Sequence, residues 1–401
     1  MKRPIKVCFP FVGNNVGGSH VSALMLASNL DRDTAEPVVV LHEEGPLADY
    51  VRQQGLDYEL IRIHEYFKPP YWRLHNVIAL AAQTLRIAAF LRRAKVDVVH
   101  SNDIRIQFGW TLASRLAGAQ LIWHQRTGTF GRKRTKLAFA LLSRTVVCIS
   151  RYTESTLPRR LDPLIRVVAN PFDTDYARLD RQAAKASILA RLKLEEGTTL
   201  VGFFGNLSQQ KRPEVFVEAA AQLSETSRGP VAFLLFGAER GDAVAELTQL
   251  ARSLGIEDRV HFMGFQAPIE PWMAGCDLMM APGVGDGLGR SLVEAMICGT
   301  PVVAADSGGH REVISDGLTG RLVAADNPGA FAEAMEALLQ NPDSANDMAD
   351  RAQREASERY SVRTHVSEMM AIYRDALGLP AKGGARAMDP DCRRHSRQDT
   401  L

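Results

Sequence analysis

The sequence predicts an α/β protein made of two doubly wound domains. At 401 residues the chain is too long for one ordinary domain. Short apolar runs of the kind found in buried parallel strands alternate with stretches of helical spacing. This alternation restarts at Thr199–Phe204, which indicates a second domain built in the same way as the first.

The composition is that of a globular protein with reduced thiols. Hydrophobic residues make up 46% of the chain, and no apolar run reaches the roughly 18 residues of a transmembrane span. The start of the chain holds a short apolar run interrupted by Pro10, which favours a first strand over a signal peptide. Five scattered cysteines form no Cys-x-x-Cys pair, so we expect thiols in a cytoplasmic protein: Cys8, Cys148, Cys276, Cys298 and Cys392.

The first domain is expected to begin with a strand, a glycine loop and a helix. The strand covers Ile5–Val12, the loop Gly13–Gly18, and Ser19 is placed to cap the helix Ser19–Leu30. This order forms a generic contact element for phosphate or sugar. The loop lacks the Gly-x-Gly-x-x-Gly pattern, which argues against an NAD-dependent oxidoreductase. Further strands are expected at Pro37–Leu41, Tyr58–Ile61, Asp97–His100, Leu121–Arg126, Thr145–Ile149 and Ile165–Ala169. A short helix is expected at Pro46–Gln54, a long helix that ends at about Lys95, and another helix that begins at about Arg151.

Charge is divided unevenly along the chain. Residues 1–178 hold 25 Lys and Arg against 15 Asp and Glu, whereas the remainder holds 23 against 31. Between Asp103 and Glu154 there is no acidic residue but nine basic ones, including Arg132–Arg134. This span permits three interpretations: a solvated surface, a phosphate-binding rim, or a face for anionic lipid, the last favoured by an amphipathic stretch at Lys136–Leu142. Nucleic acid is not an expected partner, because no groove-reading motif accompanies the charge.

The second domain is expected to repeat the alternation of strands and helices. Its first loop, Gly205–Lys211, has a glycine and a lysine but lacks the second glycine and the Ser or Thr of a P-loop. The strands expected are Thr199–Phe204, Val231–Phe236, Val260–Met263, Asp277–Ala281, Val302–Ala305 and Gly320–Ala324. The helices expected are Asp242–Leu254, Pro268–Ala274, Arg290–Cys298, Pro328–Gln340, Ser344–Arg359 and Ser361–Leu377.

The stretch from Ala281 to Leu322 carries the most specific pattern. Two glycine loops, Gly283–Gly289 and Gly308–Gly309, each follow an expected buried strand and open a helix. Such loops at the carboxyl ends of parallel strands form an anion site, because backbone N–H groups and helix N-termini face the ligand. Asp286 in the first loop and Glu294 about two turns into the helix can both face one crevice. The structural alternatives are a turn-forming Asp and a solvated helix Glu.

The residues of this stretch carry a resemblance to a known family. The pattern D-G-L-G-R-x3-E-A-M-x2-G-x-P-V-V-A-x-D-x-G-G-x2-E-V-I-x-D-G-x-T-G resembles the nucleotide-recognition region of retaining glycosyltransferases of family 4 type, which have the GT-B fold. The family usually shows Glu-x7-Glu here, and this chain has Asp286 in the first place. The resemblance implies two Rossmann-like domains facing across a cleft, with a C-terminal helix that crosses back to the first.

The resemblance also implies domain boundaries. It assigns residues 1–175 to an acceptor-side domain, 176–360 to a nucleotide-sugar domain and 361–378 to the returning helix. Residues 379–401 are charged, Gly-rich and aperiodic, so we expect a disordered tail.

Individual residues of this chain match the family's functional positions. Lys211 matches the diphosphate-binding lysine of the motif G-R-L-x3-K, whereas Asn206 stands in place of its arginine and the adjacent Arg212 is a candidate to compensate. His124 matches a histidine that contacts the donor, with His100 as the other candidate. The implied catalytic residues are His124, Asp286 and Lys211. The implied donor-binding residues are Gly17, Gly18, Gly205, Asn206, Arg212, Phe265, Gly287, Leu288, Gly289, Arg290 and Glu294.

The implied activity is glycosyl transfer with retention and without metal. A hexosyl group would move from a nucleoside diphosphate sugar to a glycan or lipid-linked acceptor, in surface polysaccharide or glycolipid synthesis. The protein would be cytoplasmic and peripheral on the cytoplasmic face of the membrane, with the acceptor around residues 64–75 and 126–136. Negative charge on the departing phosphate would be stabilised by Lys211, by amides of the 285–290 loop and by Arg290.

No metal or other cofactor is expected. Two Asp-x-Asp sequences begin at Asp31 and Asp173, and turns or linkers explain both better than a cation site. Two alternatives to the transferase stay open. A nonenzymatic relative that binds sugar nucleotides or scaffolds other transferases is suggested by Asn206 and Asp286, and a nucleotide-sugar epimerase can share the same architecture.

Overall fold

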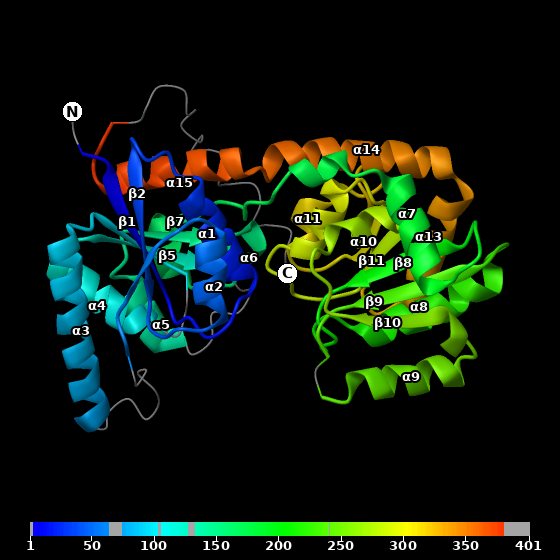
Figure 1. Cartoon of the computed structure of the whole chain (residues 1–401), viewed down its shortest axis with the longest axis horizontal. Coiled ribbons are helices and arrows are strands. Elements are labelled where there is room, and N and C mark those ends of the chain that lie inside the picture. Colours follow the sequence, from blue (N-terminus) through cyan, green and yellow to red (C-terminus); the bar gives the residue numbers. More distant parts are fainter. Residues whose placement is uncertain (1–2, 64–73, 103–105, 127–132, 240, 381–401) are drawn as a thin grey trace.

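The protein contains two parallel β-sheets, each covered by helices on both faces (Figure 1). The computed structural model describes residues 3–63, 74–102, 106–126, 133–239 and 241–380. The strands of the first sheet are β1 Ile5–Phe11, β2 Ala35–Leu41, β3 Tyr58–Leu60, β4 Val98–Ser101, β5 Gln120–Gln125, β6 Thr145–Cys148 and β7 Ile165–Val167. The strands of the second are β8 Thr199–Phe204, β9 Val231–Phe236, β10 Val260–Gly264, β11 Leu278–Ala281, β12 Val302–Ala305 and β13 Arg321–Val323.

The helices follow the strands in alternation, as a doubly wound fold requires. Those of the first half are α1 Gly18–Ser28, α2 Pro46–Gln53, α3 Leu74–Ala94, α4 Gln107–Ala117, α5 Lys133–Ala140 and α6 Arg151–Ser155. Those of the second half are α7 Arg181–Leu192, α8 Pro213–Thr226, α9 Ala243–Ser253, α10 Glu270–Gly275, α11 Arg290–Ile297, α12 His310–Val313 and α13 Pro328–Gln340. The last two helices are α14 Pro342–Arg359 and α15 Val362–Ala376.

The first sheet has the strand order β3-β2-β1-β4-β5-β6-β7, with every pair parallel. Successive residues of β1 face opposite layers, because side chains alternate across a strand. Phe9 packs with α1 and α2 on one face, whereas Cys8 packs with α3 and α4 on the other. The order reverses direction beside β1 and β4, and this is the point where open α/β sheets place their ligands.

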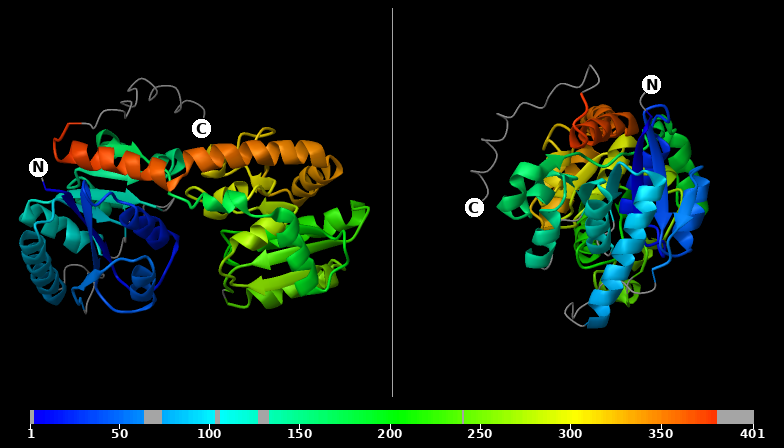
Figure 2. Two further views of the ribbon diagram at one scale, coloured as in Figure 1. Left: turned by 45° about the horizontal axis from the view of Figure 1, so that its top comes forward. Right: turned by 90° about the vertical axis from the view of Figure 1, so that its left-hand side faces the viewer.

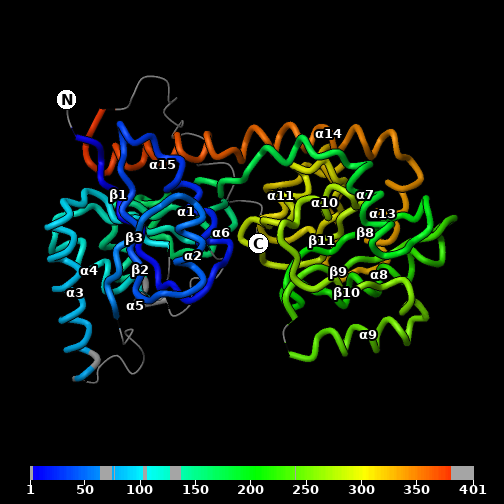
Figure 3. The backbone as a smooth tube through the Cα atoms, viewed as in Figure 1, coloured from blue at the N-terminus to red at the C-terminus, as the bar shows by residue number. Residues whose placement is uncertain are grey.

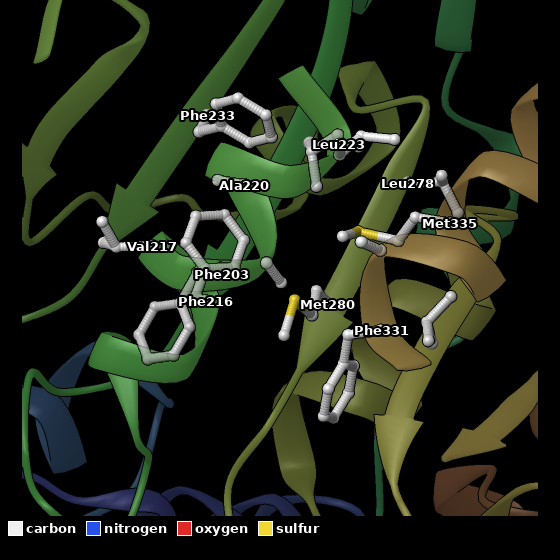
Figure 4. Packing of buried hydrophobic residues seen from close by; sticks show 14 of the residues in the cluster. Phe203, Phe216, Val217, Ala220, Leu223, Phe233, Leu278, Met280, Phe331 and Met335 are labelled. Atoms are coloured by element: carbon white, nitrogen blue, oxygen red, sulfur yellow. The ribbon is translucent and has the colours of Figure 1, made fainter. Parts of the chain in front are cut away.

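The second sheet has the order β10-β9-β8-β11-β12-β13 and is also entirely parallel. Phe203 and Phe233 pack against Phe216 of α8 on one face, and Met280 and Phe331 extend that cluster towards α13 (Figure 4). The opposite face packs against α10, α11 and α14. The switch point of this sheet lies between β8 and β11, so the loops after these two strands border the predicted ligand site.

The chain returns to the first sheet at its C-terminal end. Helix α14 runs along the second sheet, and α15 continues over the first, as the orange ribbon of Figures 1 and 2 shows. Met369 and Tyr373 of α15 are fully buried in the same cluster as Phe9. The backbone N–H of Phe172, in the segment that links the sheets, donates to the carbonyl of Tyr360 at 2.9 Å, between α14 and α15. The predicted crossing helix is therefore present.

Several local predictions differ from the structure. Helix α1 begins at Gly18 with Gly17 as its N-cap, so Ser19 lies inside the helix and the expectation that it caps the helix is wrong. Helices α4, α7 and α8 were not among the expected elements. Arg132 of the basic cluster, most of residues 64–75 and residues 381–401 of the expected tail lie outside the described residues. In the described ranges, no helix is long and apolar enough to cross a membrane.

Candidate active site

A cavity of about 320 Å³ lies where the two sheets meet. In the tube of Figure 3, loops of the first half face loops of the second half between the two sheets, and residues of both halves line the cavity. From the first half the lining includes Gly18 and Ser19 at the start of α1, Arg126 after β5, and Asn170 after β7. From the second half it includes Lys211 after β8 and residues 286–290 after β11. The cavity therefore collects the ends of strands from both sheets.

The loop between β11 and α11 is built from glycines held by hydrogen bonds. Gly285 and Gly289 adopt φ angles of +67° and +88°, where glycine is favoured because it has no Cβ. The carbonyl of Asp286 accepts from Gly309 N–H at 2.8 Å, and the carbonyl of Gly287 accepts from the Ser150 hydroxyl of the first half. The N-terminus of α11 thereby opens towards the cavity, where its free N–H groups and dipole favour an anion.

Asp286 is the centre of a hydrogen-bonded network in this loop. Its carboxylate accepts from Lys211 Nζ at 2.6 Å and contacts His310 Nε2 at 3.3 Å and Gln210 Nε2 at 3.4 Å. Burial raises the pKa of the Asp286 carboxyl, but the hydrogen bond from His310 and the charge and hydrogen bond of Lys211 outweigh burial and lower it to about 2. Asp286 is therefore an anion paired with a lysine in the cavity wall, not an isolated turn residue.

Arg290 connects the second carboxylate to the first half of the chain. Its NH2 nitrogen donates to Glu294 Oε1 at 2.8 Å, and its NH1 nitrogen donates to Ser22 Oγ of α1 at 2.7 Å. The guanidinium also stands over the ring of Phe172, with its carbon 4.5 Å from the ring centroid. Arg290 therefore links α11 to α1 at the cavity and holds the Glu294 carboxylate by a hydrogen bond, while Glu294 itself is not among the residues that line the cavity.

Arg126 and Asn170 line the cavity; from the sequence Arg126 was expected only at the edge of the acceptor region 126–136, and Asn170 was given no function. Arg126 Nε donates to Asn102 Oδ1 at 2.8 Å, and its NH1 nitrogen donates to Asn170 Oδ1. Burial lowers the pKa of the Arg126 guanidinium to about 9, and the nearby charge of Arg290 adds to this. The available signal was the position of Arg126 at the carboxyl end of a strand, two residues after His124.

Comparison with known proteins identifies the family. Residues 16–176 match the family described as Glycosyltransferase Family 4, and residues 185–355 match the family described as Glycosyl transferases group 1. The two matches together include every strand of the two sheets except β1. The chain belongs to the family-4 glycosyltransferases. The predicted resemblance is confirmed.

Curated relatives match over part of their length. The D-inositol 3-phosphate glycosyltransferase of Rhodococcus erythropolis (strain PR4) is 36% identical over 226 residues, which are 55% of this chain and 49% of the relative. That of Gordonia bronchialis is 35% identical over 229 residues, 55% of this chain and 48% of the relative. The chain thus spans about half the length of the curated relatives it matches.

Solved structures show the same fold over almost the whole chain. Anabaena Alr3699/HepE in complex with UDP and glucose has a TM-score of 0.78 at 24% identity, covering 92% of this chain and 100% of that one. A glycosyltransferase from Rickettsia africae ESF-5 has a TM-score of 0.83 at 17% identity, covering 94% and 99%. These similarities confirm the predicted architecture of two Rossmann-like sheets with C-terminal helices.

The two histidines suggested as family contacts lie behind the cavity wall. His124 is 1% exposed, and its Nδ1 lies 2.8 Å from His100 Nε2, while His100 Nδ1 lies 2.5 Å from the Tyr373 hydroxyl of α15. A buried hydroxyl with a single partner donates its proton, so the Tyr373 hydroxyl donates to His100 Nδ1 and the proton of the neutral His100 ring is on Nε2. His100 Nε2 then donates to His124 Nδ1, which places the proton of the neutral His124 ring on its Nε2. His124 Nε2 is buried without a partner. Burial and the charge of Arg126 lower the pKa of both rings, which keeps them neutral.

Three other residues predicted to bind the donor in this family-4 chain lie outside the cavity lining. Arg212 donates to the carbonyl of Ala325 at 3.1 Å and pairs with Asp326, so its charge is directed away from the cavity. Phe265 is 78% exposed and does not line the cavity. Asn206 is exposed on the loop after β8.

Glycines at the cavity mark close approaches of the backbone. A Cβ on Gly205 would contact the Lys211 side chain at 3.5 Å, and a Cβ on Gly18 would lie 2.9 Å from Arg290 Cδ. Gly17 caps α1, and its N–H donates to His20 Nδ1 at 3.0 Å. The cavity lining itself takes in Gly287, Leu288 and Gly289.

The two Asp-x-Asp sequences form turns. Asp31 Oδ1 accepts from Asp33 N–H at 3.1 Å, and Asp173 Oδ1 accepts from Asp175 N–H at 2.9 Å, so each first carboxylate closes an Asx turn. Within the part of the chain that the structure describes, no three His, Cys, Asp or Glu side chains gather in a metal-ligand group.

The Asp286 network predicts a specific loss of stability in acid. Because its folded pKa of about 2 lies below the ordinary value of 3.8, ionised Asp286 contributes stability above pH 4 that is lost as the pH falls towards 2. We expect Asp286→Asn to lower the free energy of unfolding by about 2 kcal/mol at pH 6 and by little at pH 2. Urea unfolding of both proteins between pH 2 and 7 measures this difference. An equal difference at every pH would contradict the assignment.

Proposed function

We propose that this chain transfers a hexosyl group from a nucleoside diphosphate sugar, with the donor held in the cavity between the two sheets. The observation that carries the proposal is the convergence of Lys211, Asp286 and the N-terminus of α11 on that cavity. A lysine and a helix N-terminus both attract phosphate oxygens. Glu294, on the same helix, offers a carboxylate that accepts hydrogen bonds from ribose hydroxyls.

The proposed mechanism depends on stabilising the leaving group. Glycosyl transfer breaks the bond between the anomeric carbon and the diphosphate oxygen, so the sugar develops oxocarbenium character and the diphosphate gains negative charge. Lys211 and the free amides at the start of α11 face that charge without having to reorganise, which is the arrangement that lowers the barrier of such a step. Asp286 would hold the donor sugar, and its link to Lys211 fixes the ammonium in place.

We further propose that the anomeric configuration is retained and that no metal takes part. Among the described residues that line the cavity, Asp286 is the single carboxylate, and it is paired with Lys211. A front-face attack by the acceptor hydroxyl is therefore the step proposed. An anomer-resolved NMR assay of the product, with EDTA present throughout, tests both points. An inverted product would overturn retention, and loss of turnover in EDTA would overturn metal independence.

For the acceptor we propose a glycan or lipid-linked molecule approaching from the first half of the chain. Support comes from the excess of basic residues in residues 1–178 and from the amphipathic sequence Lys136–Leu142, which together suit a protein peripheral on the cytoplasmic face of a membrane. The test is cosedimentation with liposomes containing anionic lipid, at low and physiological salt. Transfer to a soluble acceptor without any liposome binding would overturn this part.

A second candidate is a nonenzymatic protein that binds sugar nucleotides. It is favoured by one observation: Asn206 stands where the family has an arginine, and Arg212 is paired with Asp326 instead of facing the cavity. The two candidates predict different results when nucleotide binding is compared with turnover. A nonenzymatic binder would bind the nucleotide and would never turn over the sugar donor.

The first test of the donor is a thermal-shift panel of UDP, GDP, ADP, dTDP and CMP, with and without EDTA. A ligand that binds only the folded protein stabilises it by mass action, so a nucleotide at ten times its Kd contributes about 1.4 kcal/mol. We expect one nucleoside diphosphate to raise the melting temperature equally in the presence and absence of EDTA. A flat response to all five nucleotides would contradict the proposed donor site.

A further inference from the structure

Arg126 is a buried arginine whose hydrogen bonding is incomplete. A guanidinium has five N–H donors. In this chain Nε donates to Asn102 and NH1 donates to Asn170, and both acceptors are neutral amide oxygens. The NH2 nitrogen is buried and has no partner. Buried donors are almost always paired, so an unpaired one beside a cavity indicates a missing ligand.

The charge of Arg126 is also unbalanced. No carboxylate of the described residues lies within ion-pair distance of its guanidinium, whereas the other two cations at the cavity are paired, Lys211 with Asp286 and Arg290 with Glu294. A buried charge without a counterion costs folding free energy. Since the nearest histidine rings are kept neutral, the positive charge of this wall is concentrated on Arg126.

The position of Arg126 brings that charge into the donor cavity from the first half of the chain. It lines the same cavity as Lys211 and the loop before α11, which come from the second half. The family's arginine after β8 is replaced by Asn206, and Arg212 is paired elsewhere. The second half of the chain therefore lacks the arginine that the family places at this cavity, whereas the first half contributes Arg126, a cation without a counterion.

We propose that Arg126 binds a phosphate group in this cavity through its unpaired NH2 and the remaining NH1 donor. The proposal rests on the proposed transferase function, and it adds a phosphate contact from the first half of the chain to those offered by Lys211 and the loop between β11 and α11. The phosphate has two sources, the diphosphate of the donor or a phosphate on the acceptor. Asn102 and Asn170 are positioning residues, because they fix the plane of the guanidinium while leaving it without a counterion.

The test compares Arg126→Gln and Arg126→Lys with the wild-type chain and with Arg115→Gln. Arg115 is an exposed residue of α4 outside the cavity, so its variant controls for the loss of one positive charge in the first half. Isothermal titration measures Kd for three probes: UDP (or the nucleoside diphosphate selected by the panel), the corresponding nucleoside, and inorganic phosphate. The phosphate is added both to the unliganded protein and, where UDP binds, to the UDP-saturated protein. The melting temperature of each unliganded variant is measured alongside.

We expect Arg126→Gln to raise the Kd of one of the two phosphate-containing probes by about 10- to 100-fold, the range of a lost charge-assisted contact. The Kd of the nucleoside should not change. Weaker UDP binding assigns the donor diphosphate, and weaker inorganic phosphate binding with unchanged UDP assigns the acceptor. Arg126→Lys should recover part of the affinity, because it keeps the charge but loses the planar fork. The unliganded Gln variant should melt no lower than the wild type, since it removes an unbalanced buried charge.

Two results would overturn the inference. One is wild-type affinity of both Arg126 variants for UDP and for phosphate. The other is a lower melting temperature of both unliganded variants with affinities unchanged at a temperature where they are folded, because that is the behaviour of a structural residue. If wild-type protein binds inorganic phosphate through Arg126 but binds no nucleotide, the inference stands and the proposed transferase function fails.

Discussion

Lys211→Met is expected to lower kcat/KM for glycosyl transfer by about 100- to 1,000-fold, the range seen when one preorganised donor to a developing anion is removed. Lys211 lines the cavity and is the cation closest to Asp286, with Nζ 2.6 Å from the carboxylate. Its removal eliminates the positive charge that would stabilise the departing diphosphate, and it leaves the carboxylate of Asp286 without its main partner. The measurement is initial-rate kinetics with the donor selected by the nucleotide panel.

Lys185→Met is the matched control for this variant. Lys185 pairs with Asp277 at 2.7 Å, and its side chain is 27% exposed, the same fraction as that of Lys211. It belongs to α7, away from the cavity, where Asp277 also accepts from Leu200 N–H. We expect this control to lower the melting temperature and leave kcat/KM within about threefold, since it removes a structural ion pair. Equal losses of activity in the two variants would show that Lys211 acts only through stability.

Gly309→Ala is expected to cost about 2–3 kcal/mol of stability and to remove nucleotide binding, through overpacking of backbone against backbone. Gly309 has a φ angle of −70°, which alanine adopts freely, so the effect is steric. An added Cβ would lie 2.4 Å from the Gly287 carbonyl oxygen and 2.7 Å from Leu288 Cα. Neither is the end of a flexible side chain, so the loop that carries Asp286 must move.

Gly229→Ala serves as the control for the glycine variant. A Cβ at Gly229 would meet no atom within 4 Å, and its φ angle is not positive in the left-handed range, so stability should change by less than about 0.5 kcal/mol. Denaturant unfolding and titration with UDP distinguish the two variants. Gly309→Ala with wild-type stability and wild-type affinity would refute the close packing of the two glycine loops.

The sequence predicted best those elements whose pattern comes from burial on both faces. The strands Thr199–Phe204 and Val231–Phe236 and the helix Pro328–Gln340 agree with the prediction to the residue. Each strand is a continuous apolar run, and the helix begins at a proline. Helix α7 was not predicted, because it buries only Ile188 fully and its remaining pattern is weak. Helix α1 was predicted one residue late, because Ser19 looked like a cap and the bare backbone of Gly17 serves instead.

The candidate site was predictable where it depends on a local motif. Asp286, Glu294 and the glycine loops lie within one strand–loop–helix unit, so their spacing alone brings them to one edge of the sheet. Arg126 and Asn170 join them only because two domains close on each other, and Tyr373 reaches His100 across 273 positions of the chain. Arg212 was a reasonable candidate beside Lys211, but a carboxylate on a distant turn, Asp326, directs its side chain elsewhere. Such contacts are set by tertiary structure and leave no spacing in the sequence.

The return of α15 to the first sheet has a consequence for biosynthesis. Met369 and Tyr373 complete a hydrophobic core whose other members, such as Phe9 and Leu24, are translated long before them. A nascent chain that has synthesised the whole first sheet still exposes the face that α15 covers, and it does so until ribosomes have added more than 190 further residues beyond β7. The second sheet, whose strands and helices follow one another without such a gap, can close earlier. The domain translated first is therefore the one completed last.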